Sequence, residues 1–131
     1  MSDALEAYFG NGENILIVDD VEEQRDIATD MLTLLNYKPH SVSSGEAAVT
    51  FLRHHHFDLI LLDMIMDPGW GGLHTYQEIV RIHPDQRALL VSGFSKTDDV
   101  RRAQKIGAGR YLKKPYTLED LARAVKGELN G

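Results

Sequence analysis

Apolar residues gather into short continuous runs along the chain, separated by longer amphipathic stretches. Runs without polar alternation are typical of strands buried on both faces, as in a parallel sheet covered by helices. Segment 38–42 is more polar and contains Pro39, which cannot donate to a sheet ladder, so this strand is predicted at a sheet edge. The buried strands are predicted at 15–18, 59–62, 88–91 and 111–112.

The stretches between the strands carry apolar residues at helical spacing. Ser43 with Glu46 and Thr117 with Asp120 resemble capping boxes at helix starts. Asn36 suits a left-handed cap after the first helix. The helix at 73–82 should end before Pro84, and the helix near residues 100–106 has a thin apolar stripe and should be the least anchored. The clearest stripes are Ile27, Met31, Leu34 and Leu35; Ala47, Ala48, Phe51 and Leu52; and Leu118, Leu121, Ala122, Val125 and Leu129.

This alternation predicts five β-α units and an α/β fold. Right-handed crossovers would wind them into a single doubly wound parallel sheet with helices on both faces. We predict a domain over 14–129, preceded by a tail or linker remnant at 1–13 that contains the turn pair Asn11–Gly12.

Composition narrows the function classes. The chain has 131 residues, 43% of them hydrophobic and 26% charged, which suits one globular domain. There is no cysteine, so disulfides and thiol catalysis are excluded. The net charge of -6 argues against direct nucleic-acid binding. No apolar run approaches the ~20 residues of a membrane span, so we expect no membrane insertion. No secretion leader precedes the first strand, and we expect a cytoplasmic location.

Polar residues that carry chemistry stand where the predicted strands end. The first strand is followed by Asp19 and Asp20, the third by Asp63, the fourth by Ser92 and the fifth by Lys113-Lys114-Pro115. The carboxyl ends of parallel strands share one sheet edge, where ligands bind in such folds. Three converging carboxylates repel one another and need a counter-charge. Mg²⁺ suits one or two carboxylates together with phosphate and water, and a lysine and a hydroxyl would face an anion held there.

The set Asp19-Asp20, Asp63, Ser92, Tyr111 and Lys114-Pro115 resembles the motifs of the response-regulator receiver domain over roughly 14–129. The resemblance implies a flavodoxin-like strand order, 2-1-3-4-5. It also implies a switch module that is not itself an enzyme. Asp63 would accept a phosphoryl group from the phosphohistidine of a sensor histidine kinase or a histidine phosphotransfer protein.

The resemblance also implies residue roles. Asp20, Asp63 and the backbone carbonyl of Ile65 would bind Mg²⁺ directly, and Asp19 would act through a metal-bound water. Lys114 would pair with the phosphoryl oxygens, Ser92 would hydrogen-bond to one of them, and Tyr111 would turn inward. Pro115 would fix the loop after Lys114, and either isomer of its peptide bond is compatible with the sequence.

One loop departs from the family pattern. Asp67 stands where the family places a proline and Pro68 follows, so the loop 64–72 looks one residue longer. This loop and the segment Gly10-Asn11-Gly12-Glu13 resemble receivers joined behind a histidine-kinase core, the other interpretation being a free-standing receiver. We expect the output to be an interaction, another phosphotransfer or regulation of an attached kinase, with a weak homodimer through the 92–129 face.

Two positions bear on the lifetime of the phosphoryl group. Ile65 and Phe94, two residues beyond Asp63 and Ser92, should flank the path of the hydrolytic water. Neither side chain can accept a proton from that water, which predicts slow dephosphorylation. Ile65 also disfavours an aspartyl-phosphate hydrolase, because such enzymes resemble this arrangement but need a second Asp there. A flavin or nucleotide binder would need a phosphate-cradling loop after the first strand, and a receiver-like module that is never phosphorylated is the remaining alternative.

Other features favour ordinary structural roles. His54-His55-His56 suggests a polar helix end rather than a metal site, because adjacent helical residues point ~100° apart. For Asp67 we favour a turn before Pro68 over a metal ligand, and for Trp70 local packing over partner docking.

Overall fold

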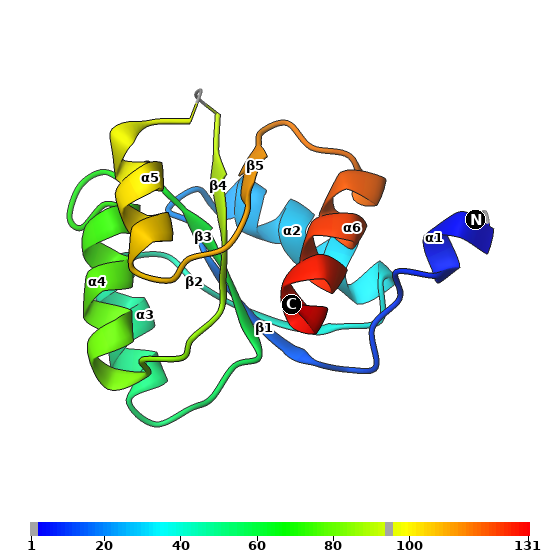
Figure 1. The fold of residues 1–131 in the computed structure, drawn as a ribbon, viewed down its shortest axis with the longest axis horizontal. Coiled ribbons are helices and arrows are strands. Elements are labelled where there is room, and N and C mark those ends of the chain that lie inside the picture. Colours follow the sequence, from blue (N-terminus) through cyan, green and yellow to red (C-terminus); the bar gives the residue numbers. More distant parts are fainter. Residues whose placement is uncertain (1–2, 94–95) are drawn as a thin grey trace.

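The computed structural model of the chain describes residues 3–93 and 96–131. Its strands form one five-stranded parallel sheet in the order β2-β1-β3-β4-β5, as predicted. Figure 1 shows α2 and α6 on one face of this sheet and α3, α4 and α5 on the other. In chain order the elements are α1 (Asp3–Glu6), β1 (Asn14–Val18), α2 (Glu22–Leu34), β2 (Lys38–Val42), α3 (Gly45–Leu52), β3 (Leu59–Asp63), α4 (Gly72–Ile82), β4 (Ala88–Ser92), α5 (Asp98–Lys105), β5 (Tyr111–Lys113) and α6 (Leu118–Asn130).

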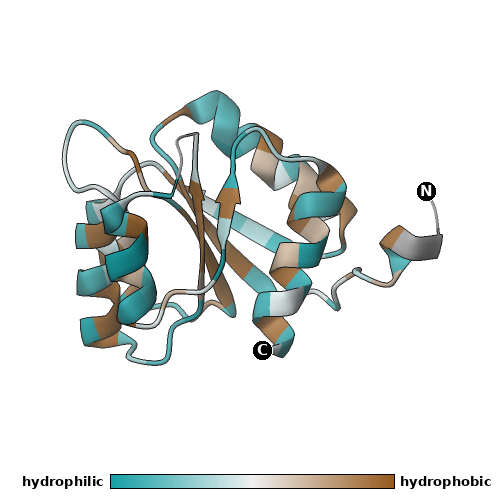
Figure 2. Cartoon of the chain, turned by 45° about the horizontal axis from the view of Figure 1, so that its top comes forward, coloured by the Kyte–Doolittle hydropathy of each residue, from teal (hydrophilic) through white to brown (hydrophobic). Residues whose placement is uncertain are grey.

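The continuous apolar strands arise because both faces of the sheet are covered. Along β1, Leu16 and Val18 join the core under α3, α4 and α5, whereas Ile15 and Ile17 join the core under α2 and α6. All four side chains are nearly inaccessible to water. Figure 2 shows the same layering, with hydrophobic strands in the middle and hydrophilic residues on the outer helix surfaces. Edge strand β2 is the most exposed and more polar, as its sequence predicted.

Three local predictions are confirmed. Thr117 and Asp120 form a reciprocal capping box at the start of α6. Asn36 has a φ of 70° just after α2, and its side chain donates to the carbonyl of Gly10 at 2.7 Å. Helix α5 buries only Val100 and Ala103 within its bounds, so its apolar stripe is as thin as expected.

One local prediction is wrong and another is wrong in part. The N-cap of α3 is Ser44, whose Oγ accepts from the Ala47 N–H at 3.0 Å, and not Ser43. Two adjacent serines offer the same cap in two registers, and the helix uses the later one. In α2 half of the predicted stripe is found: Leu35 is buried and Met31 packs against the core, whereas Ile27 and Leu34 are 42% and 59% exposed. The residues that face the sheet there are Ala28, Leu32 and Leu35.

The segment predicted to be a tail or linker remnant contacts the domain. Leu5, Tyr8 and Phe9 pack against the core beneath α2 and α6. The Gly10 N–H donates to the carbonyl of Leu35 at 2.8 Å, and Lys126 donates to the carbonyl of Phe9 at 3.0 Å. The stretch that leads into β1 is therefore held by backbone and side-chain contacts.

None of the helices within 3–93 and 96–131 combines the length and hydropathy that crossing a bilayer requires.

Candidate functional site

The register of the sheet brings three acidic residues together at the carboxyl ends of its central strands. Val18 pairs with Leu62, so Asp19 emerges beside Asp63, the last residue of β3. Carboxylate oxygens of Asp19, Asp20 and Asp63 lie within 4.8 Å of one another. Asp19 and Asp63 are buried, whereas Asp20 is partly exposed. The predicted acidic cluster is thus present in the fold.

Lys114 supplies the positive charge that faces these carboxylates. Ser92 pairs with Lys113 across β4 and β5, so Lys114 follows at the same sheet edge. Its Nζ lies 2.8 Å from Asp19 Oδ2 and 3.8 Å from Asp63 Oδ2. The peptide bond between Lys114 and Pro115 is cis. One ammonium group therefore neutralises only part of the charge of three carboxylates.

The carboxyl group of Asp63 shows the electrostatic consequence. Its pKa is raised from the ordinary 3.8 to about 6, chiefly by burial. The positive charge of Lys114 lowers this pKa, the charges of Asp19 and Asp20 raise it, and the Ile65 N–H, which donates to Asp63 Oδ1 at 3.3 Å, lowers it. Burial and like charge together outweigh the lysine. The ionised carboxylate is thus destabilised, and the site favours binding of a further cation.

The donor set fits a hard divalent cation. Three carboxylates of one cluster offer only oxygen, which Mg²⁺ prefers, and Asp20 is partly exposed to solvent. Within the described parts of the chain this is the only group of three or more side chains that could hold a metal. Asp67 is not a member. Its backbone N–H instead donates to Asp20 Oδ2 at 3.2 Å, so the loop after β3 contacts the cluster through its main chain.

The loop after β3 is packed closely against the site. A Cβ on Gly72 would lie 2.6 Å from Met64 Cα and 2.9 Å from the carbonyl oxygen of Asp63. Only glycine allows the start of α4 to approach the end of β3 in this way. The bond between Asp67 and Pro68 is cis, and the Trp70 ring is partly buried 4.3 Å from the His74 ring. Trp70 therefore packs locally, as the sequence analysis predicted.

The remaining predicted site residues lie around this cluster. Ser92 ends β4 and is buried, and its carbonyl accepts from the Tyr111 hydroxyl at 3.4 Å. The Tyr111 ring is partly buried against the core that includes Val100 of α5. The Ile65 side chain is 52% exposed. Phe94 lies outside the described residues.

Two residues near the site were missed by the sequence analysis. Tyr116 lines a small cavity of about 10 Å³ with Asp19, Asp63 and Lys114. Its pKa is raised to about 12 by burial and by the charges of Asp19 and Asp63, so its hydroxyl stays protonated. Arg25 donates to the backbone carbonyl of Asp19 at 2.9 Å. The only sequence signal for Tyr116 is its place two residues after Lys114, and Arg25 has none beyond its place in the first helix.

Comparison with known proteins agrees with this geometry. The family model of the response regulator receiver domain matches residues 15–126. The chain belongs to this family. It is a receiver domain of two-component signalling, and receiver domains act as phosphoacceptor modules rather than as classical enzymes.

Individual relatives share the domain but seldom the whole protein. The chain is 34% identical over 116 residues to the autoinducer 1 sensor kinase/phosphatase LuxN of Vibrio campbellii, covering 88% of this chain and 13% of LuxN. It is 26% identical to sporulation initiation phosphotransferase F of Bacillus subtilis, covering 87% of this chain and 91% of that protein. It spans less than half the length of several curated relatives that it matches.

A solved structure shares the fold. The receiver domain of a sensor histidine kinase from Pseudomonas aeruginosa superposes with a TM-score of 0.82 at 24% identity, over 92% of this chain and 99% of that one. That structure has a magnesium ion coordinated in its active-site cleft.

Proposed function

We propose that this receiver domain accepts a phosphoryl group on Asp63 from the phosphohistidine of a sensor histidine kinase or a histidine phosphotransfer protein, with Mg²⁺ as cofactor. The observation that carries the proposal is the position of Asp63 at the end of β3, 3.8 Å from Lys114 and clustered with two further carboxylates. An Asp63 oxygen would form the bond to phosphorus. The phosphorus–nitrogen bond of the donor would break, its electron pair remaining on the imidazole.

Each residue of the cluster would have its own role in binding Mg²⁺ or the phosphoryl group. Asp20, Asp63 and the carbonyl of Ile65 would hold Mg²⁺ directly, and Asp19 would act through water. Bound Mg²⁺ supplies positive charge that lets a carboxylate approach an anionic phosphoryl group. Lys114 would offset the charge of the phosphoryl oxygens, and Ser92 would donate a hydrogen bond to one of them. Asp19, 2.8 Å from the ammonium group, keeps Lys114 at this edge before the phosphoryl group arrives.

The signal would leave the site through β4, β5 and α5. Movement of Ser92 towards the phosphoryl group would alter its contact with Tyr111, whose hydroxyl already donates to the Ser92 carbonyl. Tyr111 would then turn further into the core beside α5. Pro115 would hold the loop that presents Lys114. This face, 92–129, is also where we place a weak homodimer.

The surroundings of the domain follow from the same proposal. We place the domain in the cytoplasm, with a histidine-containing phosphodonor as its partner. The origin that we favour is the C-terminal receiver of a hybrid sensor histidine kinase. The similarity to LuxN, which is named a sensor kinase/phosphatase, supports this origin. Any kinase activity would lie in an attached or partner protein, and the acidic charge balance of -6 disfavours direct contact with nucleic acid.

Phosphorylation by a small-molecule donor tests the acceptor. The chain is incubated with acetyl phosphate, with Mg²⁺ or with excess chelator, and intact-mass spectrometry measures the added phosphoryl group. Wild type should gain one group only with Mg²⁺, and Asp63→Asn should gain none. Asp67→Asn is the matched control, because Asp67 is an exposed acidic residue of the adjoining loop, and it should be modified like wild type. Equal modification of wild type and Asp63→Asn would refute the assignment.

A further inference from the structure

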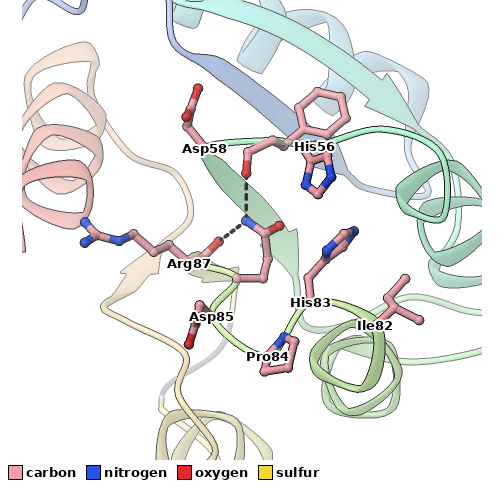
Figure 3. A pocket seen from close by; sticks show the side chains of 9 residues that line it. His56, Asp58, Ile82, His83, Pro84, Asp85 and Arg87 are labelled. Carbon is pink, nitrogen blue, oxygen red and sulfur yellow. Dashed lines mark hydrogen bonds between the residues drawn. The ribbon is translucent and has the colours of Figure 1, made fainter.

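Histidines gather at the sheet edge opposite the aspartate cluster. Two hollows near the amino ends of the strands are lined by His40, His55, His56 and His83. One hollow, of about 370 Å³, lies between the loop that precedes β3 and the loop that precedes β4. His56 and His83 face each other across one side of it, as Figure 3 shows. This site is separate from the phosphoacceptor edge and has no part in the proposed function.

The spacing of the two imidazoles matches a pair that shares one metal ion. The ring centres of His56 and His83 are 4.8 Å apart and the rings are inclined at 58°. Two imidazoles bound to one tetrahedral ion at a metal–nitrogen distance of ~2.0–2.1 Å place their ring centres roughly 5 Å apart. The separation of the two ring centres is therefore close to that of two ligands of one ion.

The tautomer of His83 is also fixed by its surroundings. Its Nε2 lies 2.7 Å from the carbonyl oxygen of Leu52, which can only accept, so Nε2 carries the proton. Nδ1 is then the nitrogen with the free lone pair. Metal-binding histidines commonly donate their second ring nitrogen to a backbone carbonyl in this way, which orients the ring before the ion binds. His56 is exposed and needs only a side-chain rotation to complete the pair.

The charges around the hollow favour a cation. Asp58 and Asp85 line it on the side of Arg87, as Figure 3 shows, and Asp58 Oδ2 accepts from the Asn14 N–H at 2.8 Å, so both contribute only nearby negative charge. Arg87 is the basic residue of the lining, but its guanidinium donates to the carbonyl of Leu129 at 2.8 Å and points towards α6 in Figure 3. The positive charge is thus directed away from the histidine pair.

We propose that His56 and His83 bind one borderline transition-metal ion such as Zn²⁺ or Cu²⁺, with water completing its coordination. Imidazole nitrogen selects such ions over Mg²⁺, which prefers oxygen and belongs to the aspartate cluster. The bound ion joins the α3–β3 loop to the end of α4. Helix α3 ends at Leu52, so His54-His55-His56 lies in the turn and loop beyond it and is not the polar helix end that the sequence analysis favoured. The second ligand comes from His83, which is distant in sequence.

Calorimetric titration of the untagged chain with Zn²⁺, in excess Mg²⁺, tests the pair. Wild type should bind one ion per chain. His56→Gln and His83→Gln should each weaken binding at least ten-fold, whereas the exposed control His54→Gln and the aspartate-site variant Asp63→Asn should bind like wild type. Circular dichroism checks that His83→Gln is folded. If His83→Gln does not fold, the test rests on His56→Gln, whose altered side chain is exposed.

Electron paramagnetic resonance of the Cu²⁺ complex gives a second readout. Splittings from two imidazole nitrogens should appear in wild type and from one in His56→Gln. The proposal is overturned if no Zn²⁺ binds, if His56→Gln binds as tightly as wild type, or if binding is lost in His54→Gln or Asp63→Asn.

Discussion

At the scale of single residues, the charge of Asp63 is expected to destabilise the fold when no metal is bound. The pKa of the Asp63 carboxyl, about 6, lies above the ordinary 3.8, so the folded chain holds this proton more tightly than the unfolded chain does. The stability that this proton gives to the fold is fully present below pH 3.8 and is lost as the pH rises through 6. Asp63→Asn should therefore raise the unfolding free energy by about 1–3 kcal/mol at pH 8. Urea denaturation in the presence of chelator measures this difference in unfolding free energy. The difference between Asp63→Asn and wild type should be smaller at pH 5 than at pH 8.

Asp67→Asn serves as the control for this effect, since Asp67 is exposed and outside the carboxylate cluster. Its unfolding free energy should change by less than about 0.5 kcal/mol. Added Mg²⁺ should stabilise wild type more than Asp63→Asn, because the variant lacks one ligand. An Asp63→Asn protein that is less stable than wild type at pH 8 would show that repulsion in the cluster is not the dominant effect.

A second prediction at this scale concerns the lifetime of the phosphoryl group. Hydrolysis needs a water in line with the new bond, and Ile65 offers that water no hydrogen bond. Ile65 is 52% exposed, so a polar substitution there costs little packing. We expect Ile65→Asn to lose its phosphoryl group several-fold faster than wild type, a smaller effect than the ~10²–10⁴-fold of fully acting general-base contacts.

Loss of the phosphoryl mass after removal of the donor measures this rate. Ile106→Asn is the matched control, because Ile106 is a similarly exposed isoleucine at the end of α5, and its decay should equal that of wild type. Phe94→Glu, the partner position from the sequence, should add to the effect of Ile65→Asn. Equal decay of wild type and the double variant would contradict the gating of water by these side chains.

At the scale of the elements, α5 is the helix expected to respond to phosphorylation. It buries only Val100 and Ala103, and Tyr111 of β5 packs against the same core. Elements with little buried area open most readily. Beryllofluoride with Mg²⁺, which mimics the phosphoryl group, should change amide exchange in peptides covering α5 and β5 and leave α3 unchanged.

Mass-resolved hydrogen exchange measures this response, and Asp63→Asn, which cannot hold the mimic, is the control that should show no change. Unaltered protection across α5 and β5 while Asp63 is occupied would refute the proposed switch.

A glycine at the α3–α4 contact carries a further prediction. A Cβ on Gly45 would lie 1.9 Å from Thr75 Oγ1, and both residues are buried. Gly45→Ala should therefore lower the unfolding free energy by about 1–3 kcal/mol through overpacking. Gly93→Ala is the control, since nothing lies within 4 Å of its Cβ position. Urea denaturation compares the two, and equal stability would show that α3 and α4 shift apart without cost.

Element types were predictable because burial on both faces of a parallel sheet leaves continuous apolar runs. The face of α2 was not predictable in the same way. Ala28, Leu32 and Leu35 form one helical stripe, and Ile27, Met31 and Leu34 form the adjacent one. The second stripe is more hydrophobic, yet Ile27 and Leu34 are exposed, whereas all three residues of the first stripe are buried in the core beneath α2 and α6. Tertiary packing decides between neighbouring stripes of this kind.

At the scale of the whole molecule, the aspartate cluster was predictable because topology alone brings the carboxyl ends of the strands together. The contact between His56 and His83 was not, since it joins two loops whose separation depends on where α3 and α4 end. The path of residues 5–12 could not be predicted from the sequence for another reason. Gly10 and Phe9 are held through their backbone carbonyls, by Asn36 and Lys126, and main-chain acceptors leave no pattern in a sequence.

These contacts predict that the segment before β1 stabilises the whole domain. Leu5, Tyr8 and Phe9 cover part of the core beneath α2 and α6, and Arg123 lies 5.7 Å above the Tyr8 ring. Deleting residues 1–9 should lower the unfolding free energy by about 1–3 kcal/mol, because partly buried apolar area returns to water. Phosphorylation by acetyl phosphate should persist, since Asp63 lies at the other edge of the sheet.

Urea denaturation of the shortened and full chains measures this loss. Lys126→Ala removes only the donor to the Phe9 carbonyl and should lose a smaller part, about 0.5–1.5 kcal/mol. Lys105→Ala, an exposed lysine at the end of α5, controls for the change in charge and should leave the midpoint unchanged. If the shortened chain unfolds at the same urea concentration as the full chain, the segment rests on the domain without stabilising it. The domain would then begin at β1 in energetic terms as well.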